Sequence, residues 1–94
     1  MAEDRELPVS FSSFIGSLFG SAMVHLGEAD DPVTRTKTID LTLARNTIDL
    51  LGVLKEKTKG NLDDEEARFL DSVLYECRTK FIEKSGGEGA QPNA

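Results

Sequence analysis

The sequence predicts an all-α fold, in which three helices form a bundle that is completed by homodimerisation. Apolar residues recur every three or four positions in three separate segments, and each segment follows a residue suited to capping a helix. The first segment also contains no charged residue, although 30% of the protein is charged. These patterns predict helices over residues 11–26, 41–59 and 64–83.

The first helix is expected from the sequence FSSFIGSLFGSAMVHL. Pro8 and Ser10 precede it; Ser10 is the expected N-cap, with Ser13 as the alternative, and Gly27 marks its end. On a helical wheel, half of the circumference is apolar. That half consists of Phe11, Phe14, Ile15, Leu18, Phe19, Ala22, Met23 and Leu26.

The other half of this helix is made of small residues instead of the charged residues of a solvated face. Each glycine inside a helix costs about 0.5–1 kcal/mol relative to alanine, so Gly16 and Gly20 predict the close approach of another backbone. We therefore expect the homodimer to form here. The predicted interface residues are Phe14, Gly16, Ser17, Leu18, Gly20, Ser21 and Val24.

The second helix is expected after a loop over residues 28–38. Asp40 is its predicted N-cap, lysines crowd its last turn, and Gly60 suits the left-handed position beyond its end. Its apolar face is broad and covers about half of the circumference. It comprises Leu41, Leu43, Ala44, Ile48, Leu50, Leu51 and Leu54.

The third helix is predicted to begin with a capping box formed by Asp63 and Glu66. Its apolar face comprises Phe69, Leu70, Val73, Leu74, Cys77 and Phe81. Three such faces carry more apolar surface than one short three-helix monomer encloses. Leaving four large side chains in water would forgo about 6–12 kcal/mol, which is comparable to the net stability of a domain.

The domain limits and the composition restrict the classes of function. We expect one helical domain over residues 10–84, with residues 1–9 and 85–94 disordered. The net charge of −6 argues against a nucleic-acid partner, because phosphate binding requires a cationic surface. The acidic start lacks the features of a secretory signal, and the apolar run of about 16 residues is shorter than the roughly 20 that span a bilayer. A cytoplasmic protein is expected.

Four features of the sequence could form sites, and the structural interpretation is preferred for each. His25 could be a ligand or a base, but no set of converging metal ligands accompanies it. Asp30-Asp31-Pro32 lacks the spacing of a calcium loop and predicts a turn. Cys77 lies on an apolar helix face and is expected to pack as a small hydrophobe. Residues 56–62, EKTKGNL, are either a turn between helices or a recognition surface. No catalytic residue, cofactor or metal is predicted.

Three blocks of the sequence resemble a known family. FSSFIGSLFGSAMVHLGE, the TIDL and IDLL segments, and EKTKGNLDDEE resemble small bacterial proteins grouped as domain of unknown function 1844. The resemblance covers residues 11–81 and implies a small, helical, cytosolic bacterial protein. No activity is assigned to that family, so no residue role is carried over.

Three functions remain open at this point. The preferred one is a non-enzymatic helical homodimer that serves as an interaction or scaffold module, with room for an unknown protein partner. The second is a peripheral accessory of a membrane complex that docks through the first helix, although this helix lacks the Lys/Arg face typical of membrane-surface helices. The third is a small-ligand binder or enzyme whose site lies at the dimer interface near His25 and Glu28.

Overall fold

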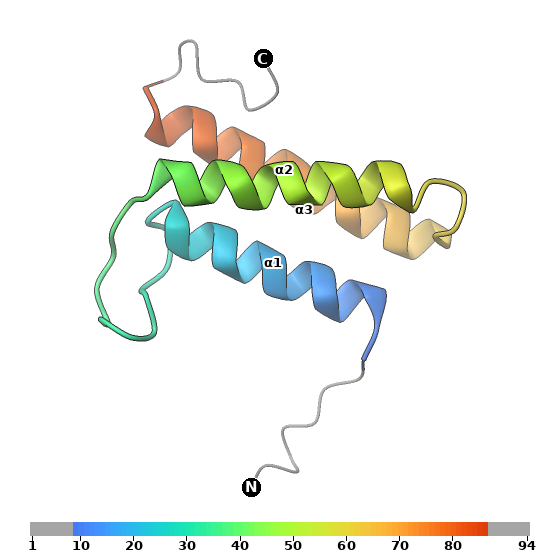
Figure 1. Cartoon of the computed structure of the whole chain (residues 1–94), viewed down its shortest axis with the longest axis horizontal. Coiled ribbons are helices and arrows are strands. Elements are labelled where there is room, and N and C mark those ends of the chain that lie inside the picture. Colours follow the sequence, from blue (N-terminus) through green and yellow to red (C-terminus); the bar gives the residue numbers. More distant parts are fainter. Residues whose placement is uncertain (1–8, 87–94) are drawn as a thin grey trace, which may run out of the picture.

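Three helices, each packed against the other two, form the part of the chain that the computed structural model describes, residues 9–86. They are α1 (Phe11–His25), α2 (Leu41–Lys57) and α3 (Asp64–Lys84). In Figure 1, α1 and α3 run in the same direction, and α2 runs in the opposite direction. Residues 9–86 contain no strand, so the predicted all-α class is confirmed.

Side-chain caps start all three helices where the sequence predicted them. The Ser10 hydroxyl accepts a hydrogen bond from the Ser13 amide at 3.0 Å, and the Ser13 hydroxyl accepts one from the Ser10 amide. Asp40 Oδ1 accepts from the amide of Leu43 at 3.0 Å. The third start is a complete capping box between Asp63 and Glu66.

The helix ends differ from the predicted ones by one or two residues. α1 stops at His25, and Gly27 follows with a φ of +77°. α2 stops at Lys57 instead of residue 59. The Thr58 amide still donates to the Leu54 carbonyl at 2.9 Å, but the next amide, that of Lys59, donates to the Glu56 carbonyl at 3.4 Å, three residues back instead of four. Gly60 is left-handed (φ +86°), as predicted, but it lies two residues beyond the C-cap. α3 extends one residue further than predicted, to Lys84.

The core lies between the three helices and uses only part of each predicted apolar face. Its buried residues are Ile15, Ala22, Leu26, Ala44, Ile48, Leu51, Leu70, Val73, Leu74, Cys77 and Phe81. Phe14, Leu43, Leu50 and Phe69 belong to the predicted faces but are exposed in the single chain. A three-helix bundle buries only the inner arc of each helix, so the broad apolar faces are left partly uncovered.

Two expectations concern the ends of the chain and the membrane. The segments expected to be disordered, residues 1–9 and 85–94, fall outside the described residues, except for Val9, Ser85 and Gly86. The Ser85 amide still donates to the Phe81 carbonyl at 3.0 Å. Within residues 9–86, no helix has the length and apolar character needed to cross a membrane.

Candidate functional site: the uncharged outer face of α1

The outer side of α1 is exposed and carries no charge. We call it the α1 face, and it consists of Ser13, Phe14, Gly16, Ser17, Gly20, Ser21 and Val24. Phe14 exposes 49% of its surface, while Gly16 and Val24 are half-buried and the others are exposed. Leu18, which the sequence also assigned to the interface, packs partly against the core. All seven predicted interface residues therefore retain some exposed surface in the single chain.

Packing within the chain gives no reason for the two glycines of the α1 face. A β-carbon added at Gly16 or at Gly20 would meet no atom within 4 Å. Gly52 in α2 is different, because a β-carbon there would lie 3.5 Å from a guanidinium nitrogen of Arg78 on α3. The helix therefore bears the conformational cost of Gly16 and Gly20 without any compensating contact in its own chain.

Two exposed leucines of α2 extend this apolar surface. Leu43 and Leu50 expose 44% and 43% of their surfaces and are seven residues apart, so they lie on one side of the helix. Lys55 of α2 pairs with Asp71 of α3, which marks the opposite side of α2 as the one facing α3. The two leucines therefore lie on the side of α2 away from α3, and α2 also packs against α1.

An open groove of about 640 Å³ lies at the C-terminal end of the α1 face. One wall is the helix itself and the other is the loop that follows it. The lining residues are Gly20, Ser21, Val24, His25 and the loop segment from Ala29 to Val33. Most of this lining is apolar, and Val33 at the loop exposes 86% of its surface.

Hydrogen bonds give the loop a defined shape. Asp31 Oδ1 accepts from the amides of Val33 and Thr34, at 2.7 and 3.3 Å, which is an Asx turn. The Asp31 amide donates to the Thr36 carbonyl at 2.9 Å, and Arg35 adopts a left-handed φ of +62°. The predicted turn at Asp30-Asp31-Pro32 is thus confirmed, and its acidic side chain organises the backbone.

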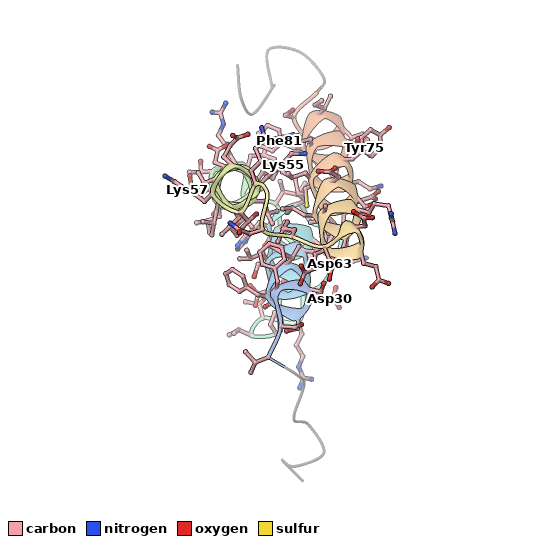
Figure 2. All side chains as sticks on the ribbon, turned by 90° about the vertical axis from the view of Figure 1, so that its right-hand side faces the viewer. Asp30, Lys55, Lys57, Asp63, Tyr75 and Phe81 are labelled. Carbon is pink, nitrogen blue, oxygen red and sulfur yellow. The ribbon has the colours of Figure 1, made fainter. Side chains whose placement is uncertain are left out.

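Charged side chains gather on the other two helices. Figure 2 shows Lys57 on α2 and Tyr75 on α3 pointing outward, on different sides of the molecule. Lys84 Nζ lies 2.8 Å from Glu28 Oε2, and Lys80 Nζ lies 3.9 Å from Glu28 Oε1. These pairs tie the start of the loop to the end of α3. The α1 face itself carries no charge, although the protein as a whole is acidic.

The Glu28 carboxylate is engaged in ion pairs with Lys80 and Lys84. The hydrogen bond from Lys84, assisted by the nearby charges of Lys80 and Lys37, holds the pKa of the Glu28 carboxyl below its usual value, although partial desolvation opposes the shift. A carboxylate with a lowered pKa is a poor general base near neutral pH. The third functional hypothesis named this residue, and its ion pairs weaken that hypothesis.

Cys77 is buried in the core, which was the interpretation preferred from the sequence. Burial raises the pKa of its thiol to about 11, with a smaller contribution from the neighbouring charge of Glu76. The thiolate is the nucleophilic form, so this cysteine is unsuited to covalent catalysis at neutral pH.

His25 and residues 56–62 complete the set of sequence candidates. His25 lines the groove, and its carbonyl accepts a hydrogen bond from the Asp40 amide at 2.8 Å. No group of three or more His, Cys, Asp or Glu side chains placed to hold a metal ion occurs within residues 9–86. Residues 56–62 comprise the last two residues of α2 and most of the turn to α3, which is shaped by the bond from the Asn61 amide to the Thr58 carbonyl at 2.8 Å.

Comparison with known families covers nearly the whole helical unit. The family described as domain of unknown function (DUF1844) matches residues 8–83, which include α1, α2 and all but the last residue of α3. The chain belongs to the DUF1844 family. No curated protein matches this DUF1844 chain, and no solved structure does. The family description assigns no activity, so the function has to be argued from the surface of the molecule.

Sequence reasoning found the α1 face but missed what surrounds it. Leu43 and Leu50 were predicted only as members of the broad apolar face of the second helix, with no distinction between buried and exposed positions. The groove depends on how the loop folds back beside α1, and the Glu28–Lys84 pair joins residues far apart in the chain. Neither feature leaves a local signal in the sequence.

Proposed function

We propose that this DUF1844 protein is a non-enzymatic interaction module of the bacterial cytoplasm, and that it works as a homodimer formed through the α1 face. The observation that carries the proposal is the exposure of Phe14 on a helix face without any charge, in a protein with a net charge of −6. Such a face gains little from water and is suited to contact with another protein.

The distribution of charge on the α1 face is compatible with self-association. In a twofold dimer each surface meets a copy of itself, so any net charge on the contact would repel its counterpart. The α1 face contains no Asp, Glu, Lys or Arg, and two copies of the acidic protein can therefore meet there without like-charge opposition.

The available area reaches the lower limit for a specific dimer. Helices of 15 and 17 residues are about 22 and 25 Å long, and two neighbouring helices about 9 Å apart present a face roughly 20 Å wide. This corresponds to about 500 Å² per copy and about 1,000 Å² in total, the lower bound for a biological interface. Leu43, Leu50 and Phe14 would supply its apolar centre.

The other functions receive less support from the described residues. A membrane-surface helix usually pairs its apolar side with lysines and arginines, and α1 has neither. An enzyme would need a reactive group, whereas the Cys77 thiol is buried and Glu28 is held by two lysines. The net negative charge also opposes binding to nucleic acid.

A charge placed on the α1 face tests the proposal. Ser17→Glu puts two carboxylates close to each other across the proposed contact, and we expect the dissociation constant to rise at least about tenfold. Ser72→Glu adds the same charge to an exposed position of α3 and is the matched control. Size-exclusion chromatography with light scattering at micromolar concentration reads out the mass, for which a monomer is 10.3 kDa.

Three results are distinguishable in this experiment. The proposal expects dimers for the parent protein and Ser72→Glu, and a monomer for Ser17→Glu. Equal dimerisation of all three proteins would place the interface elsewhere, and a monomeric parent protein would refute self-association. Flotation of the parent protein with vesicles of neutral or anionic lipid would support the membrane function instead.

A further inference from the structure

The dimer proposed above can be given an orientation. We infer that α1 packs antiparallel to α1 of the second copy about a twofold axis near Ser17, so that Phe14 of each copy enters the groove beside Gly20 and Ser21 of the other. This inference rests on the proposed function, because it assumes that the occupant of the α1 face is a second copy of the chain.

The α1 face combines one protruding residue with one recess. Phe14 is the large aromatic residue on it and exposes 49% of its surface. Six residues further along the helix, Gly20 and Ser21 form the floor of the groove, and the loop segment from Ala29 to Val33 forms its far wall. The groove volume of about 640 Å³ leaves ample room for a phenyl ring.

An antiparallel register brings these two features together. With the axis at Ser17, a residue at position i lies opposite position 34 − i of the other copy, which places Phe14 opposite Gly20. A parallel pair would instead place Phe14 opposite Phe14 and leave the two grooves empty. Close packing of interfaces favours the arrangement in which a large side chain meets a small one.

The same register accounts for two further exposed apolar residues. Val9 lies just before α1 and is fully exposed in the single chain. In the antiparallel arrangement the start of α1 meets the end of α1 of the other copy, so Val9 falls near that end, where the groove and Val33 lie. The loop is held in place there by the bonds of Asp31 and by the Glu28–Lys84 pair, so it offers a formed wall to the incoming chain.

The groove also explains why glycine occupies position 20. A β-carbon there meets no atom of its own chain within 4 Å, but it would project into the space that we assign to Phe14 of the second copy. Glycine is the residue that permits the closest approach of a side chain to a helix backbone. The cost of a helical glycine is then offset by a contact between chains.

Cysteine pairs on the α1 face distinguish the orientations and leave Phe14 in place. A disulfide requires α-carbons within about 7 Å, which helices in contact satisfy only at matched positions. Ser17→Cys lies near the axis, so it should form a covalent dimer with itself. Ser13→Cys and Ser21→Cys occupy matched positions, so they should link to each other in a mixture, whereas each alone should not. The parent protein is the control, because its Cys77 is buried.

Oxidation at micromolar concentration, followed by a non-reducing gel, gives the result. Covalent dimers of Ser17→Cys, together with a link that appears only when Ser13→Cys and Ser21→Cys are mixed, support the inference. If Ser13→Cys and Ser21→Cys each link to themselves and mixing adds nothing, the chains are parallel and the inference is overturned, although the dimer stands. If no variant links and light scattering shows a monomer throughout, the proposed function fails as well.

Discussion

Replacing Phe14 by serine removes the largest exposed apolar group of the α1 face and leaves an uncharged side chain like its neighbours. Phe14 exposes 49% of its surface in the single chain, so about half of the residue remains to be buried on association. Serine is already present at positions 13, 17 and 21 of the same helix, and the helix tolerates it on the exposed side.

The expected change in affinity follows from that exposure. Full burial of a phenylalanine side chain is worth about 1.5–3 kcal/mol, so half of it is worth about 0.75–1.5 kcal/mol. Each substitution counts twice in a twofold dimer, which gives about 1.5–3 kcal/mol per dimer. At about 1.4 kcal/mol per factor of ten, the dissociation constant should rise about 10- to 100-fold.

Sedimentation equilibrium over a range of loading concentrations measures this dissociation constant directly. Tyr75→Ser is the control, because Tyr75 exposes 73% of its surface on the outer side of α3, and it should leave the constant unchanged. Circular dichroism of both variants should retain the helical spectrum. An unchanged constant for Phe14→Ser, or an equal weakening by Tyr75→Ser, would refute the assignment of the interface to α1.

Four further predictions follow from individual contacts. The Cys77 thiol, whose pKa burial raises to about 11, should resist a thiol reagent at pH 8 in the native protein and react once guanidinium unfolds it; fast native labelling would contradict its burial. Because Lys84 lowers the pKa of Glu28, the pair stabilises the fold fully above the ordinary glutamate pKa of about 4.3 and less as the pH falls through the lowered value. The melting temperature should therefore drop less on acidification for Glu28→Gln than for the parent protein. Asp63→Ala removes the cap of α3 and should cost about 1 kcal/mol, a fall of roughly 4–8 °C in Tm; no fall would show that the cap is dispensable. Gly20→Ala should stabilise the monomer by about 0.5–1 kcal/mol in chemical denaturation yet weaken the dimer, and a gain in both would contradict the groove contact.

Local signals in the sequence were sufficient to predict most of the helical framework. Ser10, Asp40 and Asp63 are N-caps as expected, because capping depends on residues within one turn. The end of α2 was misplaced by two residues, because the bonding pattern changes at Lys59, whose amide donates to the Glu56 carbonyl, and residue preferences do not reveal where that change occurs.

The surface around the α1 face was harder to predict, because it depends on packing between distant segments. Leu43 and Leu50 have the spacing of core residues, and only the positions of α1 and α3 show that they lie outside the core. The groove likewise depends on the left-handed Arg35 and the Asx turn of Asp31, which bring the loop back beside the helix. The absence of charged residues from α1 could be recognised from the sequence alone, because it is a local property that does not depend on the fold.

The mass of the unmodified protein in solution, measured by sedimentation equilibrium from about 1 to 100 μM, is the most direct test of whether a second copy covers the α1 face. We predict a concentration-dependent rise from 10.3 kDa to twice that value. A mass that stays at 10.3 kDa across the whole range would show that Phe14 and the glycines beside it remain in water, and self-association through α1 would have to be abandoned.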